Sequence, residues 1–304
     1  MNVIVVGSGA REHALCRILH KSYLCEKVFC FPGNYGISQI AECKDISTKE
    51  DIVEECIKIN PDLVVVGPEN YLSENLAGEL RNKGLNVFGP DSEGAKLESS
   101  KEFMKEFCQS HNIPTAKSQT FVDFDEAKNY LESFNGPIVV KYDGLAAGKG
   151  VFVCTNTNEA IEACERIFIK KEFNQENNKV VIEEFIEGKE LSFFTITDGN
   201  EYLNIGSAQD YKRVGNNDTG PNTGGMGTIS PAPILDNNLD MIIQDQIVKK
   251  TIEGLKHDNI AFQGVIFFGI IVNEHNQPYF CLLYTSDAAA EGLGVDLGGR
   301  RIIK

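Results

Sequence analysis

Short apolar runs alternate with segments of helical spacing over the first 90 residues. The apolar runs lie at 2–6, 27–31, 62–69 and 85–90, and the helical segments at 11–21, 49–60 and 72–83. Strand-length apolar runs separated by amphipathic helices predict an α/β region with a doubly wound parallel sheet.

Three of the predicted strands end in short polar loops that carry glycine: GSGARE (7–12), PGNYG (32–36) and GPEN (67–70). Ligands of such sheets bind beyond the carboxyl ends of the strands, so we expect these loops to share one rim. The first loop is not a GxGxxG fingerprint, because Glu12 stands where the third glycine would be. Its glycines and Arg11 suit an anion, but a plain strand–helix turn explains them equally well.

The pattern changes after a predicted helix at 99–111 and the segment IPTA (113–116). Helical spacing at 122–134 and 158–168 flanks two strands joined by a glycine-rich loop (136–154), and a strand pair around a polar hinge follows at 179–197. These segments predict a small α+β lobe with an antiparallel sheet.

A third pattern begins at residue 201. A strand-like segment leads into a long polar loop (209–228), a helix at about 236–257 and a strand pair at 262–272. Long loops inside a compact domain are unusual and often functional, although a plain surface loop is the alternative.

Composition excludes several classes of protein. The net charge is −15 with no basic block, which argues against nucleic acid or an anionic membrane as a partner. No apolar run approaches the roughly 20 residues of a membrane span, and the first residues show no basic segment of a signal peptide. The nine cysteines form no C-x-x-C pair, so we expect reduced thiols and a cytoplasmic protein.

The most informative stretch is KYDGLAAGKG (141–150). Three glycines and two alanines allow the backbone to approach a ligand closely, and Lys141 and Lys149 suit a polyphosphate. The spacing differs from that of the common P-loop, GxxxxGK[ST]. A flexible hairpin with incidental lysines is the plain alternative. The acidic strand end IEEFIEGKE (182–190) offers edge hydrogen bonds to a base, but alone it is equally a solvated face.

In order along the chain, these motifs resemble the glycinamide ribonucleotide synthetase (phosphoribosylamine–glycine ligase) family of ATP-grasp enzymes. The resemblance covers about residues 1–280. It is carried by GSGAREHA (7–14), PGNYG (32–36), VVGPE (65–69), FGP (88–90), SKEFMK (100–105), IPTA (113–116), VVKYDGLAAGKGV (139–151), VIEEFIEGKELSF (181–193), QDYKRVGNNDTGPNTGGMGTISPAP (209–233) and GVIFFGIIV (264–272).

The resemblance implies an ATP-grasp fold of two lobes after the parallel sheet, with the second lobe incomplete. It implies an N-terminal domain at 1–100, a connecting helix and linker at 101–120, a small lobe at 121–192 and a large lobe at 193–281. Residues 282–304 are expected to be a non-native tail. The family reaction joins glycine to 5-phosphoribosylamine, with ATP as phosphoryl donor and a glycyl phosphate as intermediate.

The resemblance also implies roles for individual residues. Expected at ATP are Lys101, Lys141, Gly144, Gly148, Lys149, Gly150, Glu183, Glu184, Phe185, Ile186 and Glu190. Expected at the substrates are Gly9, Arg11, Glu12, Gly33, Asn34, Gly67, Pro68, Glu69, Pro221, Asn222, Thr223 and Met226. Expected at the reacting groups are Asp210, Lys212, Gly224 and Gly225.

One departure concerns the metal. The family uses Mg²⁺ or Mn²⁺, held by Glu and Asn of an E-x-N-x-R-x-GDPE segment, and residues 279–304 do not contain that pattern. We therefore expect no metal ligands from this segment and impaired activity, with an inactive or nucleotide-binding remnant as one alternative. A dinucleotide-dependent oxidoreductase is another, but it predicts GxGxxG and an acidic end to the second strand, which here ends in Pro32-Gly33-Asn34.

Overall fold

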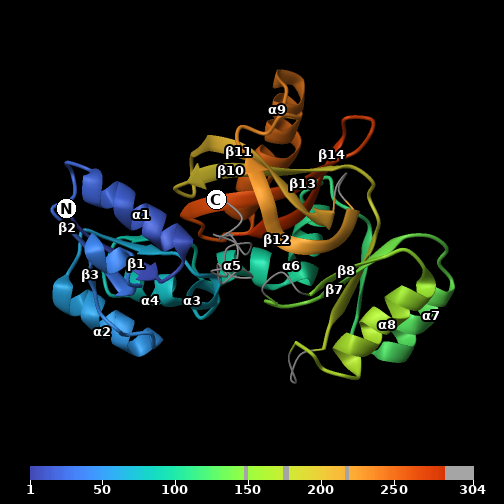
Figure 1. Cartoon of the computed structure of the whole chain (residues 1–304), viewed down its shortest axis with the longest axis horizontal. Helices are drawn as coiled ribbons and strands as arrows, with labels where there is room; N and C mark the ends of the chain where they lie inside the picture. Colours follow the sequence, from blue (N-terminus) through green and yellow to red (C-terminus); the bar gives the residue numbers. More distant parts are fainter. Residues whose placement is uncertain (147–149, 174–177, 216–218, 285–304) are drawn as a thin grey trace.

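The chain forms three sheets arranged in a row, as the computed structural model in Figure 1 shows. The structure describes residues 1–146, 150–173, 178–215 and 219–284, and only the backbone of 212–213, 219–225 and 282–284. The N-terminal sheet lies at the left of the view, the large sheet in the middle and the small sheet at the lower right. None of the helices in these ranges is long and apolar enough to cross a membrane.

The N-terminal sheet is parallel and has the order β3-β2-β1-β4-β5. Its strands are β1 (Asn2–Gly7), β2 (Lys27–Pro32), β3 (Glu42–Cys43), β4 (Leu63–Val66) and β5 (Val87–Phe88). The helices around it are α1 (Ala10–Lys21), α2 (Lys49–Ile59), α3 (Glu69–Ser73) and α4 (Leu76–Asn82), with a 3₁₀ turn η1 (Ile37–Gln39). This sheet is the parallel α/β region that the apolar alternation predicts.

Both faces of this sheet are covered, because successive side chains of β1 point in opposite directions. Val5 packs in one apolar cluster with Cys16 of α1, and Ile4 packs in another with Ile52 of α2 and Leu76 of α4. The sheet is therefore doubly wound, and α1 and α3 begin directly after the loops that follow β1 and β4.

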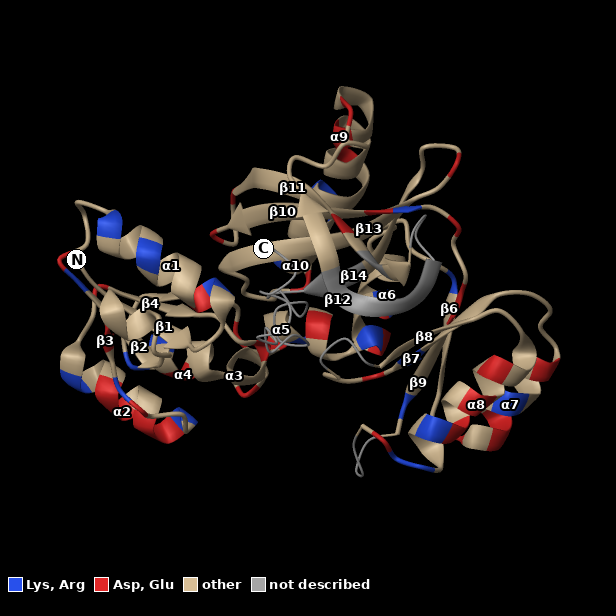
Figure 2. Cartoon of the chain, viewed as in Figure 1, with Lys and Arg blue, Asp and Glu red and all other residues tan. Residues whose placement is uncertain are grey.

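The small sheet is antiparallel, with the order β6-β9-β7-β8. Its elements are β6 (Ser118–Phe121), α7 (Phe124–Glu132), β7 (Ile138–Tyr142), β8 (Val151–Cys154), α8 (Thr157–Phe168) and β9 (Val180–Glu184). Leu131 of α7 and Ile167 of α8 pack with Val140 of β7 in one core, so the two helices cover the same face. The charged outer surfaces of both helices are visible in Figure 2.

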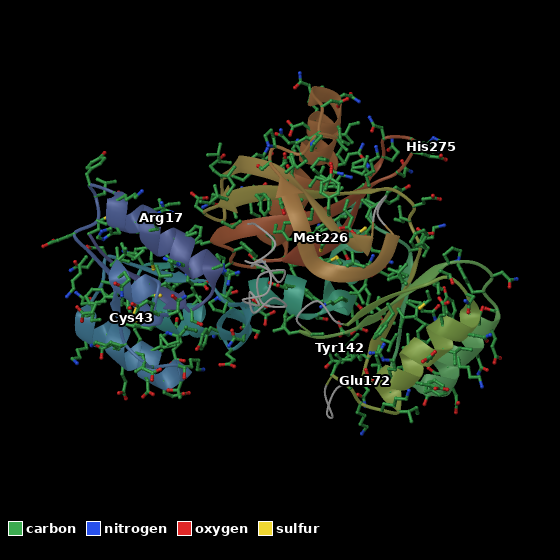
Figure 3. The ribbon with its side chains drawn as sticks, viewed as in Figure 1. Arg17, Cys43, Tyr142, Glu172, Met226 and His275 are labelled. Carbon is green, nitrogen blue, oxygen red and sulfur yellow. The ribbon has the colours of Figure 1, made fainter. Side chains whose placement is uncertain are left out.

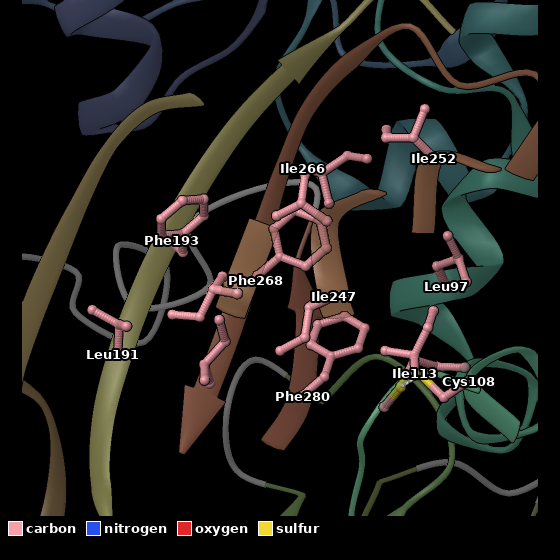
Figure 4. Close-up of a cluster of buried hydrophobic side chains, with 14 of the residues drawn as sticks. Leu97, Cys108, Ile113, Leu191, Phe193, Ile247, Ile252, Ile266, Phe268 and Phe280 are labelled. Carbon is pink, nitrogen blue, oxygen red and sulfur yellow. Dashed lines mark hydrogen bonds between the residues drawn. The ribbon is translucent and has the colours of Figure 1, made fainter. Parts of the chain in front are cut away.

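The large sheet is antiparallel, with the order β12-β11-β10-β13-β14. Its elements are β10 (Lys189–Thr197), β11 (Tyr202–Gly215), β12 (Thr219–Ile229), β13 (Gly264–Val272) and β14 (Pro278–Tyr284). The helical layer consists of α5 (Ser92–Ser99), α6 (Lys101–Ser110), α9 (Asn237–Ile243), the π-helix η2 (Gln244–Val248) and α10 (Lys249–His257). Phe193, Phe268 and Phe280 meet Ile247 and Leu97 in the core between the sheet and these helices (Figure 4).

The structure corrects the expectation of a polar loop at 209–228. Strands β11 and β12 form a hairpin across this segment, with Gln209 opposite Ile229 and register shifts farther along. Main-chain pairing needs no apolar side chains, so a glycine-rich, polar sequence can form strands that apolar alternation does not reveal. Figure 1 shows β12 curving across the large sheet.

Three smaller expectations were also wrong. The segment at 72–83 is divided between α3 and α4, because Asn75 adopts a left-handed conformation with φ of 65°. The segment at 262–272 contains one strand, β13, whose hairpin partner is β14. The two strands at 179–197 do not pair with each other: β9 belongs to the small sheet and β10 to the large one.

Candidate active site

The three glycine-bearing loops of the N-terminal sheet share one rim, as predicted. The amide of Gly33 donates to the carbonyl oxygen of Gly7 at 3.1 Å, and the Asn34 side-chain amide donates to the carbonyl oxygen of Ser8 at 2.7 Å. On the other side, the amide of Gly67 donates to the carbonyl oxygen of Val6 at 3.2 Å. Strand order β2-β1-β4 causes this proximity, because parallel neighbours end at the same edge.

Glu12 is buried inside this rim. Its Oε2 accepts from the amide of Gly9 at 2.7 Å, and its Oε1 accepts from Nε of Arg11 at the same distance. A β-carbon on Gly67 would lie 2.2 Å from Glu12 Oε1, so the absence of a side chain there makes room for the carboxylate. Glu12 therefore holds the 7–12 loop against the 67–69 loop and orients Arg11.

A buried carboxylate joins two lysines where the small sheet meets α6. Lys141 Nζ lies 2.9 Å from Glu183 Oε1, and Lys105 Nζ lies 3.1 Å from Glu183 Oε2. All three side chains are at least 96% buried, since the exposed fractions are 4%, 4% and 3%. Pairing of this kind is what allows charges to remain inside a protein.

Further contacts tie these lysines to other elements. Lys105 Nζ donates to Thr115 Oγ1 at 2.8 Å and to the carbonyl oxygen of Ala116 at 3.1 Å. Lys141 Nζ donates to the carbonyl oxygen of Cys281 on β14 at 3.2 Å. The cluster thus connects α6, β7, β9 and β14, the elements that surround the junction of the two lobes.

Asp143 anchors the start of the glycine-rich loop to the beginning of α6. Its Oδ1 accepts from the amides of Lys101 at 2.5 Å and Glu102 at 3.2 Å, and from Ser100 Oγ at 3.2 Å. In return, Lys101 Nζ donates to the carbonyl oxygen of Gly144 at 2.8 Å. A carboxylate at a helix N-terminus satisfies free amides and complements the helix dipole.

Small residues shape the loop itself. Gly144 has a φ of 157°, and a β-carbon there would lie 2.6 Å from the ring of Tyr142. Tyr142 is buried and stacks on Phe173 with ring centroids 5.2 Å apart. Gly150 closes the loop, because its carbonyl oxygen accepts from the backbone amide of Tyr142 at 2.8 Å. Gly148 and Lys149 lie outside the described residues.

The electrostatics of the lysines suit an anion. Burial lowers the pKa of Lys101, with Lys141 acting in the same direction and Glu98 opposing it. Burial also lowers the pKa of Lys105, against the effect of Glu183. Neighbouring carboxylates therefore do not fully compensate these ammonium groups. Lys141 Nζ donates one hydrogen bond, to the carbonyl oxygen of Cys281, and lies within ion-pair distance of Glu183 Oε1, so these contacts do not use all three donors of its ammonium group.

The residues expected at the adenine hinge lie on the connection from β9 to β10. The backbone amide of Glu184 donates to the carbonyl oxygen of Lys117 at 2.9 Å, and the backbone amide of Lys117 donates to Glu184 Oε1 at the same distance. Phe185 is 38% exposed, Ile186 is half-buried and Glu190 is exposed. The hinge thus runs along an open edge between the two lobes, while Glu183 points its carboxylate inward to the lysines.

The hairpin carries the remaining candidates. Asp210 pairs with Thr228 across the strands, and Thr228 Oγ donates to its carboxylate. Met226 is 59% exposed, and Figure 3 shows it on the hairpin above the strand that carries Tyr142. Only the backbone is described for the other candidates on this hairpin, which are Lys212, Pro221, Asn222, Thr223, Gly224 and Gly225.

Comparison with known proteins agrees with this architecture. Residues 1–98 match the family model for the N domain of phosphoribosylglycinamide synthetase. Residues 99–284 match the family model for the ATP-grasp (A) domain of the same enzyme. The chain belongs to the phosphoribosylglycinamide synthetase family. The predicted resemblance and the predicted combination of a parallel sheet with an ATP-grasp fold are confirmed.

Several relatives carry the corresponding name. A chloroplastic phosphoribosylamine–glycine ligase of Arabidopsis thaliana is 47% identical over 269 residues, which are 87% of this chain and 51% of that protein. The ligase of Brucella melitensis is 44% identical over 274 residues, which are 90% of this chain and 64% of that protein. This synthetase-family chain therefore spans about half to two thirds of these relatives.

A solved structure supports the fold. The crystal structure of phosphoribosylamine–glycine ligase from Thermotoga maritima superimposes with a TM-score of 0.79 at 30% identity, covering 93% of this chain and 68% of the other.

The family match ends at residue 284, where β14 also ends, so three residues of the expected non-native tail belong to the large sheet. Residues 285–304 lie outside the described residues.

Sequence reasoning missed two members of the site. Asp143 lies inside the glycine-rich motif, but a cap supplied by a distant loop has no local sequence signal. Lys105 had a signal: it follows Lys101 by four residues, which places both on one face of a helix. A lysine on an otherwise buried helix face indicates a buried partner, and that partner is Glu183.

Proposed function

We propose that this chain binds ATP between the lysine cluster and the β9–β10 hinge and uses it to ligate glycine to 5-phosphoribosylamine. The products would be glycinamide ribonucleotide, ADP and phosphate, with glycyl phosphate as intermediate, in purine biosynthesis. Family membership and the names of the relatives support the reaction. The cluster of Lys101, Lys141 and Glu183 is the observation that carries the nucleotide site.

In the proposed arrangement, each part of the site has its own task. Lys141 and Lys101 hold phosphate oxygens, and the Gly144 carbonyl keeps Lys101 in place. Glu183 fixes the direction of Lys141, and the main chain at 184–186 lies along the base. The rim formed by 7–12, 32–34 and 67–69, with Arg11 oriented by Glu12, receives the phosphate of phosphoribosylamine. Glycine would lie beside the hairpin at Asp210 and 221–226.

The chemistry requires little more than neutralisation and alignment. A carboxylate of glycine attacks the terminal phosphorus of ATP, ADP leaves, and the amine of phosphoribosylamine then displaces phosphate from the acyl carbon. Fixed ammonium groups stabilise the negative charge that moves onto the leaving oxygens, and a shared cleft aligns the three reactants.

A magnesium or manganese ion would further neutralise the phosphates when bound. Within the described ranges, no group of three His, Cys, Asp or Glu side chains converges beside Lys101 or Lys141. A second candidate function is a chain that binds nucleotide with reduced or no ligase activity, and the observation that favours it is the lack of an E-x-N-x-R-x-GDPE pattern in residues 279–304. A cytoplasmic location stays a prediction from the nine thiols, all of which are free.

Nucleotide binding and ligation can be tested separately. Titration with ATP should show one site in the wild-type chain, and the Lys141→Glu variant should lose it, because an added carboxylate would face the phosphates. Lys128→Glu is the matched control, since Lys128 is 44% exposed on α7. Unchanged ATP affinity in Lys141→Glu would disprove the proposed nucleotide site.

The second measurement is ADP release in the presence of magnesium, glycine and phosphoribosylamine. Release that requires both substrates supports the ligase, whereas ATP binding without such release supports the nucleotide-binding remnant.

A further inference from the structure

Two histidines and an aspartate converge on the side of the large lobe, at the end of α6 opposite Lys101. His111 Nε2 lies 2.8 Å from Asp258 Oδ2, and His257 Nδ1 lies 2.8 Å from Asp258 Oδ1. One potential ligand atom from each residue lies within 4.8 Å of the other two. No other group of this kind occurs in the part of the chain that the structure describes.

Two helix ends create this arrangement. His111 is the C-cap of α6, and Asp258 is the C-cap of α10, directly after His257. The C-terminal end of each helix carries a partial negative charge, so two such ends meeting at one point favour a cation between them.

The ring of His111 is held in place by packing. A β-carbon on Gly254 of α10 would lie 2.8 Å from two atoms of the His111 ring, so the glycine makes the space that the ring occupies. Phe107 flanks the ring at a centroid distance of 4.7 Å. The side chain of His111 is 14% exposed, whereas those of Asp258 and His257 are 34% and 80% exposed. One ligand is therefore pre-oriented, and the opposite side is open to an ion from solvent.

The donor set selects a class of metal. Two imidazole nitrogens and one carboxylate suit zinc and neighbouring first-row transition ions, whereas magnesium and calcium prefer oxygen ligands alone. Three protein ligands leave one tetrahedral position for water. Nearby cations are engaged elsewhere: Lys250 Nζ donates to the carbonyl oxygen of Asn112, and Lys256 Nζ donates to that of Asn200.

We propose that His111, His257 and Asp258 form a binding site for a zinc-class divalent ion, separate from the ATP cleft. The ion would replace the two histidine–aspartate hydrogen bonds by three coordination bonds. It would join helix ends that are 147 residues apart in the chain. Because α6 carries Lys101 and Lys105 nearer its other end, the ion would fix the helix that supports the lysine cluster.

The test uses the full chain without an affinity tag, dialysed against a chelator and titrated with Co²⁺ and with Zn²⁺. Free thiols also bind these ions, so Co²⁺ absorption separates nitrogen and oxygen ligands from thiolate, which adds an intense charge-transfer band. His257→Ala removes one exposed ligand. His275→Ala is the matched control, because His275 is 77% exposed in the turn between β13 and β14 (Figure 3).

The wild type and His275→Ala should bind one equivalent of Co²⁺ without a thiolate band and should gain thermal stability on adding Zn²⁺. His257→Ala should bind roughly 10-fold or more weakly and lose the stability gain. Asp258→Asn should behave like His257→Ala. Equal affinity of His257→Ala and wild type, or a thiolate band in the tightest site, would overturn the proposal. These outcomes do not depend on ATP binding, so they leave the proposed function untouched.

Discussion

Lys105 Nζ lies 3.1 Å from Glu183 Oε2 in the interior of the chain, whereas Lys141 Nζ contacts the other oxygen of the same carboxylate. One acid thus orders two ammonium groups, of which only Lys141 is assigned to the nucleotide. Lys105 supports it indirectly, because it fixes the plane of the carboxylate that directs Lys141. It is a positioning residue.

Lys105→Met should lower the free energy of unfolding by roughly 3 kcal/mol, since removing one partner of a buried ion pair leaves its carboxylate under-compensated. Urea unfolding measures the change. Lys96→Met is the control: Lys96 is 47% exposed and pairs with Glu93 one turn away, so about 0–1 kcal/mol is expected. Equal effects of the two substitutions would contradict the assigned role of Lys105.

The same variant distinguishes positioning from plain stability. Lys105→Met should also weaken ATP binding under conditions where the chain is fully folded, because Glu183 would then rotate and redirect Lys141. Isothermal titration at low temperature measures this. If the Lys105→Met chain is destabilised but folded and binds ATP with the wild-type affinity, Lys105 contributes to stability alone and does not position Lys141.

Asp143→Ala should disconnect the glycine-rich loop from α6. The substitution removes three hydrogen bonds to a carboxylate at the helix N-terminus, so a loss of roughly 2 kcal/mol in the free energy of unfolding is expected. Asp123→Ala is the matched control, because Asp123 caps α7 through the amides of Asp125 and Glu126 without touching the loop.

The control should lose about 1 kcal/mol and keep its ATP affinity. Asp143→Ala should lose ATP affinity as well, since Lys101 and Gly144 would no longer be held together. If both variants bind ATP equally well, the link between the cap and the nucleotide site is wrong.

Much of this architecture follows from local patterns in the sequence. Apolar alternation predicts the parallel sheet, because β1 and β4 bury nearly all of their side chains and polar loops follow their carboxyl ends. The spacing of the glycines predicts the tight turn at 141–150, because the φ of 157° at Gly144 and its close approach to the ring of Tyr142 restrict the residue type. Both signals are local.

The features that sequence reasoning missed are set by residues far apart in the chain. The β11–β12 hairpin is stabilised by main-chain pairing that polar side chains do not reveal. Asp143 caps a helix 42 residues before it, and Lys105 meets Glu183 across two elements. Such partners are determined by the packing of the lobes, which no single segment encodes.

Gly67→Ala should disturb the rim formed by the 7–12, 32–34 and 67–69 loops. A β-carbon there would lie 2.2 Å from Glu12 Oε1 and 3.1 Å from the carbonyl oxygen of Val6, and a buried carboxylate between two hydrogen bonds has little freedom to move. A loss of about 1–3 kcal/mol in the free energy of unfolding is expected, which urea unfolding measures. Gly227→Ala is the control, because a β-carbon on Gly227 would meet nothing within 4 Å. Equal stability of Gly67→Ala and Gly227→Ala would show that the rim tolerates a side chain at Gly67.

The contribution of Asp258 to the free energy of unfolding should decrease at acid pH, because His111 and His257 stabilise its ionised carboxylate. Hydrogen bonds from His257 and then His111 hold the pKa of the Asp258 carboxyl below its usual range of about 3.9. Because the pKa is lower in the folded than in the unfolded chain, the stabilisation is complete above the unfolded value and disappears as pH falls through the folded value. In the presence of a chelator, the difference in free energy of unfolding between wild type and Asp258→Asn should therefore shrink between about pH 5 and pH 3. Asp245→Asn, an exposed change on η2, should show the same difference at both pH values. A difference for Asp258→Asn that stays constant over this range would show that the carboxylate is not stabilised by the two histidines.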